Sequence, residues 1–247
     1  MDLCKRLNST ARLAIVGLDS SRPARLREFL AGPVALVTPQ DAGNLIGQVD
    51  AVLLCTRDGR DHAAQALPLL RAGISVWVDK PLATREADAR AMVGAAAATR
   101  VVLACRSGFR DAAATREAEA WVRDQAGPVT VTIEGPADPR SPYGGLAHYG
   151  VHHVELACEL AARPLDVHSA TDRRARLTGE NLTVDLVFRP EAEAFTITAG
   201  ERLRIEAPAT YLEDQVAAFL DAVERGLGTA DPEALVEPVR LLERILG

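Results

Sequence analysis

Short, continuously apolar runs alternate with segments of helical periodicity along the first hundred residues, and this alternation constrains the fold more than any other feature. The intervening segments 23–30, 62–72 and 84–98 have the apolar spacing of helices. The apolar runs lie at 12–17, 34–37, 50–55, 74–78 and 100–105. Apolar strands separated by helices are typical of a parallel sheet that is buried on both faces. Because crossovers between such strands are right-handed, we predict an α/β fold for residues 1–108, with a Rossmann-like, doubly wound parallel sheet.

The pattern changes after residue 108. Helices are expected over 111–125 and 148–161, with a Pro/Gly-rich loop over 135–145 between them. Strands are expected at 128–134, 167–171, 182–188, 195–198 and 203–205. Two amphipathic helices, 211–225 and 232–246, close the chain. Strands that follow one another with short turns form antiparallel sheets, so residues 109–247 are predicted to form an α+β domain with a mostly antiparallel open sheet.

The amino-acid composition limits the classes of partner that the protein is expected to bind. The net charge of −6 disfavours a nucleic-acid partner, which would need clustered Lys and Arg. No apolar run has the length needed to cross a bilayer, and no apolar signal segment follows Lys5 and Arg6, so we expect no membrane partner and a cytoplasmic location. Four cysteines without a CxxC pair are expected to be reduced thiols. A small-molecule substrate is the expected partner.

The turn after the first strand is a weak dinucleotide motif. Of the three glycines that normally let the backbone approach a pyrophosphate, only Gly17 is present. Asp19 takes the place of the second glycine, and its carboxylate near a phosphate would cost about 1–3 kcal/mol. Ser20 and Ser21 can still donate hydrogen bonds at the start of a helix. In the alternative interpretation, Ser21 only caps that helix.

The second strand lacks another part of this motif. An NAD-binding domain usually carries an acid at the end of this strand, where it binds the ribose hydroxyls. Here the strand ends in Val37-Thr38-Pro39, and only about ten residues separate it from the next strand. A helix and a strand of the usual fold are therefore expected to be missing.

Lys80 is the strongest single candidate for chemistry. The strand 74–78 leads directly into Asp79-Lys80-Pro81, and ligands bind at the carboxyl ends of parallel strands. The chain has 28 basic residues, but only Lys5 and Lys80 are lysines. A lysine at such an edge can bond a reacting oxygen and relay its proton. The alternative is an ordinary surface lysine before a turn proline.

A glycine-rich loop then opens a helix that carries three histidines and an acid. His148 and His152 are four residues apart and share one helix face, with Glu155 one turn further on. No HExxH motif or cysteine set accompanies them, so no metal is expected. A histidine acting as general acid or base is favoured instead, because its ordinary pKa is near neutral. For His153 and His168, a buried or capping role is the alternative.

Several motifs in one order resemble the Gfo/Idh/MocA family of oxidoreductases, named after glucose–fructose oxidoreductase and inositol dehydrogenase. The strand 50–56 is similar to a family strand that ends in Thr-Pro, and 62–73 to a helix that begins with His and ends in Ala-Gly. Residues 79–83, Asp-Lys-Pro-Leu-Ala, are similar to the family's Glu-Lys-Pro-Leu-Ala. Residues 144–156 resemble its Gly-Gly…Gly-Ile-His-x-x-Asp-Leu helix, and 211–225 resemble its closing helix.

The resemblance implies an N-terminal domain for NAD or NADP, a C-terminal domain whose open sheet pairs subunits into a homodimer or higher oligomer, and a substrate between them. Lys80 would contact the nicotinamide and the substrate hydroxyl, and His152 would exchange the proton. Pro81 would shape the turn, often through a cis bond, with Thr56 and Asp79 beside the dinucleotide.

Two sets of residues follow. The expected cofactor-binding set is Gly17, Leu18, Asp19, Ser20, Ser21, Thr56, Arg57, His62, Asp79, Lys80 and Pro81. The expected substrate-binding set is Tyr143, His148, Tyr149 and Glu155. The chain departs from the family pattern at Arg57, where the family has Pro, at Asp79, where it has Glu, and at His148, where some members have Asp.

The sequence therefore predicts an NAD(P)-dependent oxidoreductase that acts on a polar hydroxyl or carbonyl compound, such as a sugar, cyclitol or biosynthetic intermediate. Two alternatives remain open at this point. One is a non-redox relative that binds a small metabolite as a sensor or accessory subunit, favoured by the reduced glycine motif. The other is a redox-neutral lyase or hydrolase that uses the same lysine and histidine.

Overall fold

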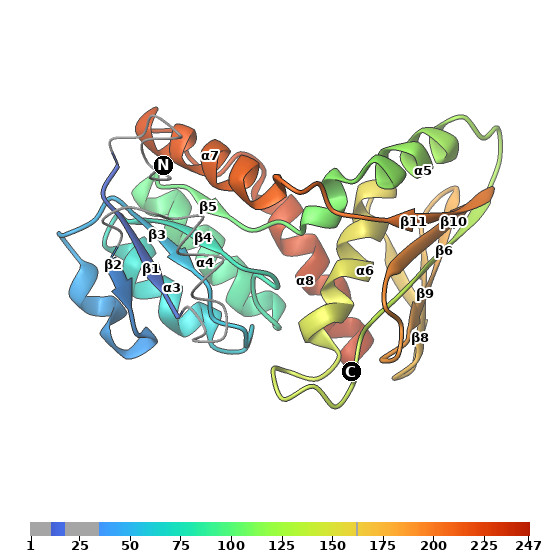
Figure 1. Ribbon diagram of the computed structural model, residues 1–247, viewed down its shortest axis with the longest axis horizontal. Coiled ribbons are helices and arrows are strands. Elements are labelled where there is room, and N and C mark those ends of the chain that lie inside the picture. Colours follow the sequence, from blue (N-terminus) through green and yellow to red (C-terminus); the bar gives the residue numbers. More distant parts are fainter. Residues whose placement is uncertain (1–10, 18–34, 162) are drawn as a thin grey trace. The chain divides into compact units, whose positions relative to one another are not determined.

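A computed structural model describes residues 11–17, 35–161 and 163–247 (Figure 1). The chain separates into two compact units. The first comprises residues 1–105 and 212–236, and the second comprises 106–211 and 237–247. The boundary thus falls near the predicted one at 108, but residues 212–236, expected in the C-terminal domain, belong to the first unit.

The first unit contains a five-stranded parallel sheet. Its strand order is β2-β1-β3-β4-β5, and every pair of neighbours is parallel, as predicted. The strands are β1 (Leu13–Val16), β2 (Ala35–Val37), β3 (Ala51–Leu54), β4 (Ser75–Val78) and β5 (Leu103–Ala104). All residues of β1, β3 and β4 are buried, which explains why these runs are apolar throughout rather than alternating.

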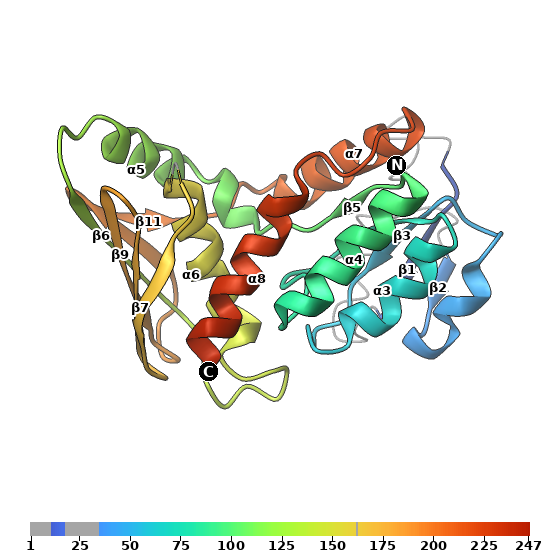
Figure 2. The ribbon, with the colours of Figure 1, turned by 180° about the vertical axis from the view of Figure 1, so that it is seen from behind.

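Helices cover both faces of this sheet. One face, with Ile15, Leu53 and Trp77, packs against Val216 and Phe219 of α7 (Tyr211–Glu224). The side chains that alternate with these point to the opposite face. Helices α3 (His62–Arg71) and α4 (Glu86–Thr99) lie there, packed against each other (Figure 2). The helix expected over 23–30 lies outside the described residues.

The strand order identifies the missing segment. In the common doubly wound order 3-2-1-4-5-6, removal of the third strand leaves the order seen here. A 3-10 helix, η1 (Pro39–Leu45), takes the place of the lost helix and strand and connects β2 to β3. The strand order reverses between β1 and β3, so the loops that follow these two strands flank the position where doubly wound sheets bind ligands.

The second unit is built on a six-stranded sheet with the order β11-β10-β6-β9-β8-β7. Only β6 and β9 are parallel neighbours, so the sheet is mostly antiparallel, as predicted. Its strands are β6 (Val129–Gly135), β7 (Asp166–Ala170), β8 (Arg174–Thr178), β9 (Leu182–Phe188), β10 (Phe195–Ala199) and β11 (Glu201–Ile205). Strand β8 was not predicted.

One face of this sheet is covered and the other is open. Apolar residues such as Ile133, Leu186 and Ile197 pack against α5 (Ala113–Arg123), α6 (Ala147–Leu160) and the end of α8 (Pro232–Leu246). The alternating residues on the open face are mostly polar, and Arg176 pairs there with Asp185 at 2.7 Å. The short 3-10 helix η2 (Gly108–Asp111) precedes α5. None of the described helices has the length and apolar character needed to cross a membrane.

Candidate functional site

Gly17 follows β1 at the point where the strand order of the first sheet reverses. Its φ is +72°, and its N–H donates to the carbonyl oxygen of Val37 at 3.1 Å. A Cβ atom added there would lie 2.1 Å from Cγ2 of Thr56, which follows β3. Only glycine therefore fits, because any side chain would both adopt a strained backbone and collide with Thr56. The loops after β1 and β3 thus meet at this edge.

His62 ties together two of the loops at this edge. The ring has no exposed surface, and its Nδ1 lies 2.7 Å from the carbonyl oxygen of Pro81, while its Nε2 lies 3.0 Å from that of Thr56. Both partners only accept hydrogen bonds, so a neutral ring can donate to one of them and a protonated ring to both. His62 therefore connects the loop after β3 to the loop after β4. The sequence analysis expected this side chain to contact the cofactor directly, whereas here it is buried between the two loops.

The Lys80 turn follows β4 at the same edge of the sheet. The Lys80–Pro81 peptide bond is cis, as the family resemblance implies. Gly59 packs so closely on Pro81 that a Cβ at Gly59 would lie 2.5 Å from the proline ring. Asp79 accepts a hydrogen bond from the backbone N–H of Lys80 at 3.0 Å, and both side chains are half-buried. The turn is therefore fixed on two sides.

The remaining expected cofactor residues divide into two groups. Thr56 and Arg57 are half-buried in the loop after β3, and the Thr56 hydroxyl donates to Oε1 of Gln65 at 2.8 Å. The others, Leu18, Asp19, Ser20 and Ser21, lie outside the described residues.

The residues at the carboxyl ends of β1, β3 and β4 have the chemistry needed to bind a dinucleotide. Gly17 brings the loop after β1 into close contact with Thr56 at the switch point, and the loop after β4 brings an ammonium group on Lys80 and a carboxylate on Asp79. Backbone groups and cations suit phosphates, and carboxylates suit ribose hydroxyls. Gly17, Asp79 and Lys80 are the residues that would hold the cofactor.

His152 of the second unit lies on α6 in an aromatic environment. It is 6% exposed, and its Nδ1 is 2.7 Å from the Ser107 hydroxyl. The rings of Phe109, Tyr149 and Phe195 meet it edge-on, with centroid distances of 5.0, 5.3 and 5.5 Å. Ser107 therefore engages Nδ1 of the imidazole ring.

Glu155 is an anchor for this histidine. It is 4% exposed, and its Oε2 accepts the backbone N–H of Ser107 at 2.7 Å and lies 3.7 Å from the Arg110 guanidinium. Burial opposes the charge on Arg110, but the nearby Glu155 and Glu159 outweigh it and raise the pKa of the guanidinium. Glu155 therefore holds the Ser107 turn, which differs from the substrate contact expected for it.

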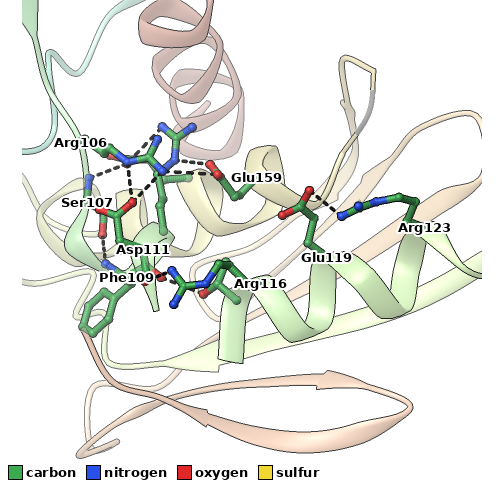
Figure 3. Close-up of polar contacts among 11 residues, drawn as sticks. Arg106, Ser107, Phe109, Asp111, Arg116, Glu119, Arg123 and Glu159 are labelled. Carbon is green, nitrogen blue, oxygen red and sulfur yellow. Dashed lines mark hydrogen bonds and ion pairs between the residues drawn. The ribbon is translucent and has the colours of Figure 1, made fainter. Parts of the chain in front are cut away.

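An ion-pair network supports the same turn (Figure 3). Arg106 lies between Asp111 and Glu159, with N···O distances of 2.9 and 3.4 Å. Partly buried pairs of this kind are screened less by salt than surface pairs. The network connects η2, which carries Ser107 at its start, to α6, which carries His152.

The other histidines have separate environments. His153 is fully buried, with Nε2 3.2 Å from the carbonyl oxygen of Val187, and burial lowers its pKa to about 4. It is the core histidine that the alternative interpretation allowed. His168 lies exposed on β7, so a buried or capping role is wrong for it.

Tyr143, His148 and Tyr149 form a chain of rings that leads to His152. Neighbouring centroids are 5.1, 5.1 and 5.3 Å apart in this order, and Tyr149 is 38% exposed. The structure thus brings three of the four expected substrate residues together with the expected acid or base. In the described part of the chain, no group of three or more His, Cys, Asp or Glu side chains is arranged to hold a metal ion.

Ser107 was missed in the sequence analysis. No motif marks it, since it lies 45 residues from His152 and the two meet only through the packing of η2 on α6. The same is true of Gly59, whose role depends on its contact with Pro81.

Comparison with known proteins matches a family model to the N-terminal part of the chain. Residues 3–107 match the Gfo/Idh/MocA family, described as an oxidoreductase family with an NAD-binding Rossmann fold. Comparison with curated proteins gives no match.

Similar crystal structures extend over both units. The KijD10 3-ketoreductase from Actinomadura kijaniata, with TDP-benzene and NADP, has a TM-score of 0.75 at 17% identity over 95% of this chain and 96% of that one. The WlbA (WbpB) dehydrogenase from Thermus thermophilus, with NAD and UDP-GlcNAcA, has a TM-score of 0.73 at 15% identity over 96% and 95%. A myo-inositol 2-dehydrogenase from Lactobacillus plantarum has a TM-score of 0.72 at 14% identity over 99% and 92%. Residues 3–107 of this chain are therefore similar to the Gfo/Idh/MocA oxidoreductase family, and the chain as a whole shares the fold of these dehydrogenases and ketoreductases.

Proposed function

We propose that this protein is an NAD(P)-dependent oxidoreductase that transfers a hydride to or from a polar hydroxyl or carbonyl compound. The observation that carries the proposal is the position of Lys80, directly after β4 and at the same sheet edge as the Gly17–Thr56 contact. That edge is where doubly wound sheets bind dinucleotides. The family of residues 3–107 and the NAD and NADP in similar structures support it.

In this proposal, the ammonium group of Lys80 donates a hydrogen bond to the reacting oxygen of the substrate and polarises it. His152 exchanges the proton at this oxygen through Nε2, while Ser107 holds Nδ1. The bound dinucleotide supplies or accepts the hydride. The fixed Pro81 turn and the buried Glu155 keep the two groups from changing orientation.

We propose a sugar or cyclitol as the substrate, free or as part of a larger molecule. The exposed Tyr149 ring and its neighbours Tyr143 and His148 offer flat surfaces with polar tips. Such surfaces suit a ring that has apolar faces and a polar edge. The sugar nucleotide in the Thermus structure and the inositol named for the Lactobacillus enzyme support this class.

We further propose that the protein is cytoplasmic and forms a homodimer or higher oligomer through the open face of the second sheet. That face is polar, and its charges are paired along the strands, as in the contacts of Arg202 and Arg189 with Glu134 at 3.1 Å each. An interface there would be rich in hydrogen bonds. Sedimentation of the wild-type chain tests this, and a monomer at all concentrations would refute it.

The test of the activity begins with titration of the protein with NADH and NADPH, followed by oxidation and reduction assays on sugars, cyclitols and their keto forms. His152→Asn is expected to lower kcat about 10²–10⁴-fold, because it removes the acid or base. His168→Asn, on the exposed β7, is the matched control and should keep full activity. Lys80→Met should lower turnover while leaving the folded structure intact.

The alternatives give different results. Absence of binding to either dinucleotide at millimolar concentration would refute the redox proposal and favour a cofactor-free binding protein. Turnover of a substrate without added dinucleotide, lost in His152→Asn, would instead indicate a redox-neutral lyase or hydrolase.

A further inference from the structure

Asp41 places a carboxylate beside the end of β2, although the strand itself does not end in an acid. Thr38 follows β2 directly, and its hydroxyl donates a hydrogen bond to Oδ2 of Asp41 at 2.5 Å. The backbone N–H of Asp41 in turn donates to the carbonyl oxygen of Thr38 at 3.1 Å. These two contacts fold the chain back on itself, so the Asp41 carboxylate lies next to the first residue after the strand.

This strand end is a neighbour of the Gly17 turn. Strands β1 and β2 are parallel, with Val16 level with Val37, and the N–H of Gly17 donates to the carbonyl oxygen of Val37 at 3.1 Å. The pair formed by Thr38 and Asp41 therefore belongs to the sheet edge at which the cofactor is proposed to bind. In doubly wound sheets, this strand end is the place for the ribose hydroxyls of NAD or the ribose phosphate of NADP.

The helix that carries Asp41 is fixed to the sheet. Ala42 and Leu45 of η1 are buried, and η1 packs against β1 and α3. Asp41 itself is exposed, and no other side chain or backbone group of the described residues donates a hydrogen bond to its Oδ1. An ionised carboxylate accepts several hydrogen bonds, so Asp41 can accept further ones from ligand hydroxyls.

The segment around Asp41 contains no cation. Residues 35–56, from β2 to the first residues after β3, include neither lysine nor arginine, although the chain has 28 basic residues. A dinucleotide site that accepts NADP places an arginine near this strand end to bind the 2′-phosphate. Here a 2′-phosphate would lie near a carboxylate, and like charges a few ångströms apart repel each other.

We propose that Asp41 is a specificity-determining residue, which accepts hydrogen bonds from the ribose hydroxyls of NAD and disfavours the 2′-phosphate of NADP. Thr38 is the positioning residue that holds the carboxylate at the strand end. The protein therefore uses NAD in preference to NADP. This inference rests on the proposed function, because it concerns the cofactor of that same site.

Cofactor binding measures the preference directly. The full-length wild-type protein is titrated with NADH and with NADPH, and the two dissociation constants are compared as a ratio. NADH should bind about 10- to 100-fold more tightly. Because salt screens the repulsion at an exposed carboxylate, the ratio should decrease as the ionic strength rises. Equal binding of the two dinucleotides, or tighter binding of NADPH, would overturn the proposal.

Asp41→Asn tests the charge, because it keeps the shape of the side chain. It should tighten NADPH binding about tenfold and bring the ratio toward one. Asp50→Asn is the matched control, since Asp50 precedes β3 at the opposite edge of the same sheet and its replacement changes the net charge equally. Its ratio should equal that of the wild type. An unchanged ratio in Asp41→Asn, or equal shifts in both variants, would overturn the role of Asp41.

Two variants of Thr38 separate positioning from support of the fold. Thr38→Val removes the hydroxyl and should reduce the preference for NADH about 3- to 10-fold, whereas Thr38→Ser keeps the hydroxyl and should retain the preference. A ratio in Thr38→Val equal to that of the wild type would overturn the positioning role. If the wild type binds neither dinucleotide, the proposed function is refuted, and the cofactor preference with it.

Discussion

Replacing Gly17 by alanine tests the geometry on which the proposed cofactor site depends. Gly17 has φ +72°, and an added Cβ would lie 2.1 Å from Cγ2 of Thr56. A residue with a side chain pays about 1–2 kcal/mol for this backbone conformation. Inserting a methyl group into a packed contact adds about 1–3 kcal/mol. Gly17→Ala should therefore lower the free energy of unfolding of the first unit by about 2–5 kcal/mol.

Gly47 provides the matched control. Its φ is +79°, but no atom lies within 4 Å of an added Cβ. Gly47→Ala should therefore show the backbone cost alone, about 1–2 kcal/mol. The difference between the two variants measures the collision with Thr56.

A second variant locates the collision. Thr56→Ser removes Cγ2 but keeps the hydroxyl that donates to Gln65. In the Gly17→Ala/Thr56→Ser protein, the nearest atoms to the new Cβ would be 3.2 Å away, so most of the collision energy should be recovered. A double-mutant cycle then gives the interaction free energy between the two positions.

Tryptophan fluorescence in urea can follow the first unit separately. The chain has two tryptophans, and Trp77 lies in β4 of the first unit while Trp121 lies in α5 of the second. In a Trp121→Phe background, the emission of Trp77 reports the first sheet alone. Equal costs for Gly17→Ala and Gly47→Ala, or no recovery with Thr56→Ser, would show that the loops after β1 and β3 do not meet as described.

Two further predictions concern buried histidines. Burial lowers the pKa of His153 to about 4, so between pH 6.5 and 4 the unfolded chain binds a proton there and the folded chain does not. The free energy of unfolding should therefore fall by about 3 kcal/mol as the pH drops through this window. Urea unfolding of His153→Gln should show a smaller loss, and a pH dependence equal to that of the wild type would contradict the reasoning. His62→Phe should cost about 1–3 kcal/mol, because the carbonyl of Thr56 or Pro81 that accepts from the neutral ring loses its donor, and it should weaken NADH binding. Unchanged stability and binding would show that the ring does not hold the two loops.

The strands that could be predicted are those whose apolar sequence pattern matches their burial in the folded protein. Strands β1, β3 and β4 are buried on both faces, so their apolar runs were sufficient to find them. Strand β8 was missed because its outward residues, Arg174 and Arg176, leave only Ala175 and Leu177 as an apolar signal. Its identity as a strand depends on its pairing with β7 and β9.

The candidate site divides in a similar way. The sequence marks Lys80 and His152 as candidates by their residue types and by their places at the end of a strand and the start of a helix, and their roles stay predictions. The supporting role of His62 and the anchor role of Glu155 could not, because both depend on partners distant in sequence. Its place on the histidine helix made Glu155 a candidate for the substrate, and the structure shows it buried and bonded to the backbone N–H of Ser107.

The placement of α7 has a consequence for synthesis on the ribosome. The face of the first sheet that carries Leu53 and Trp77 is covered by α7, which begins about a hundred residues after the sheet is complete. The second sheet is finished at Ile205, before that cover has been made, yet its own core needs Leu241 and Leu242 of α8. Neither unit is therefore a continuous stretch of chain, and a cut after Cys105 would leave an apolar sheet face exposed on one fragment. A nascent chain must protect this face, by chaperone binding or by staying partly unfolded, until α7 has been synthesised.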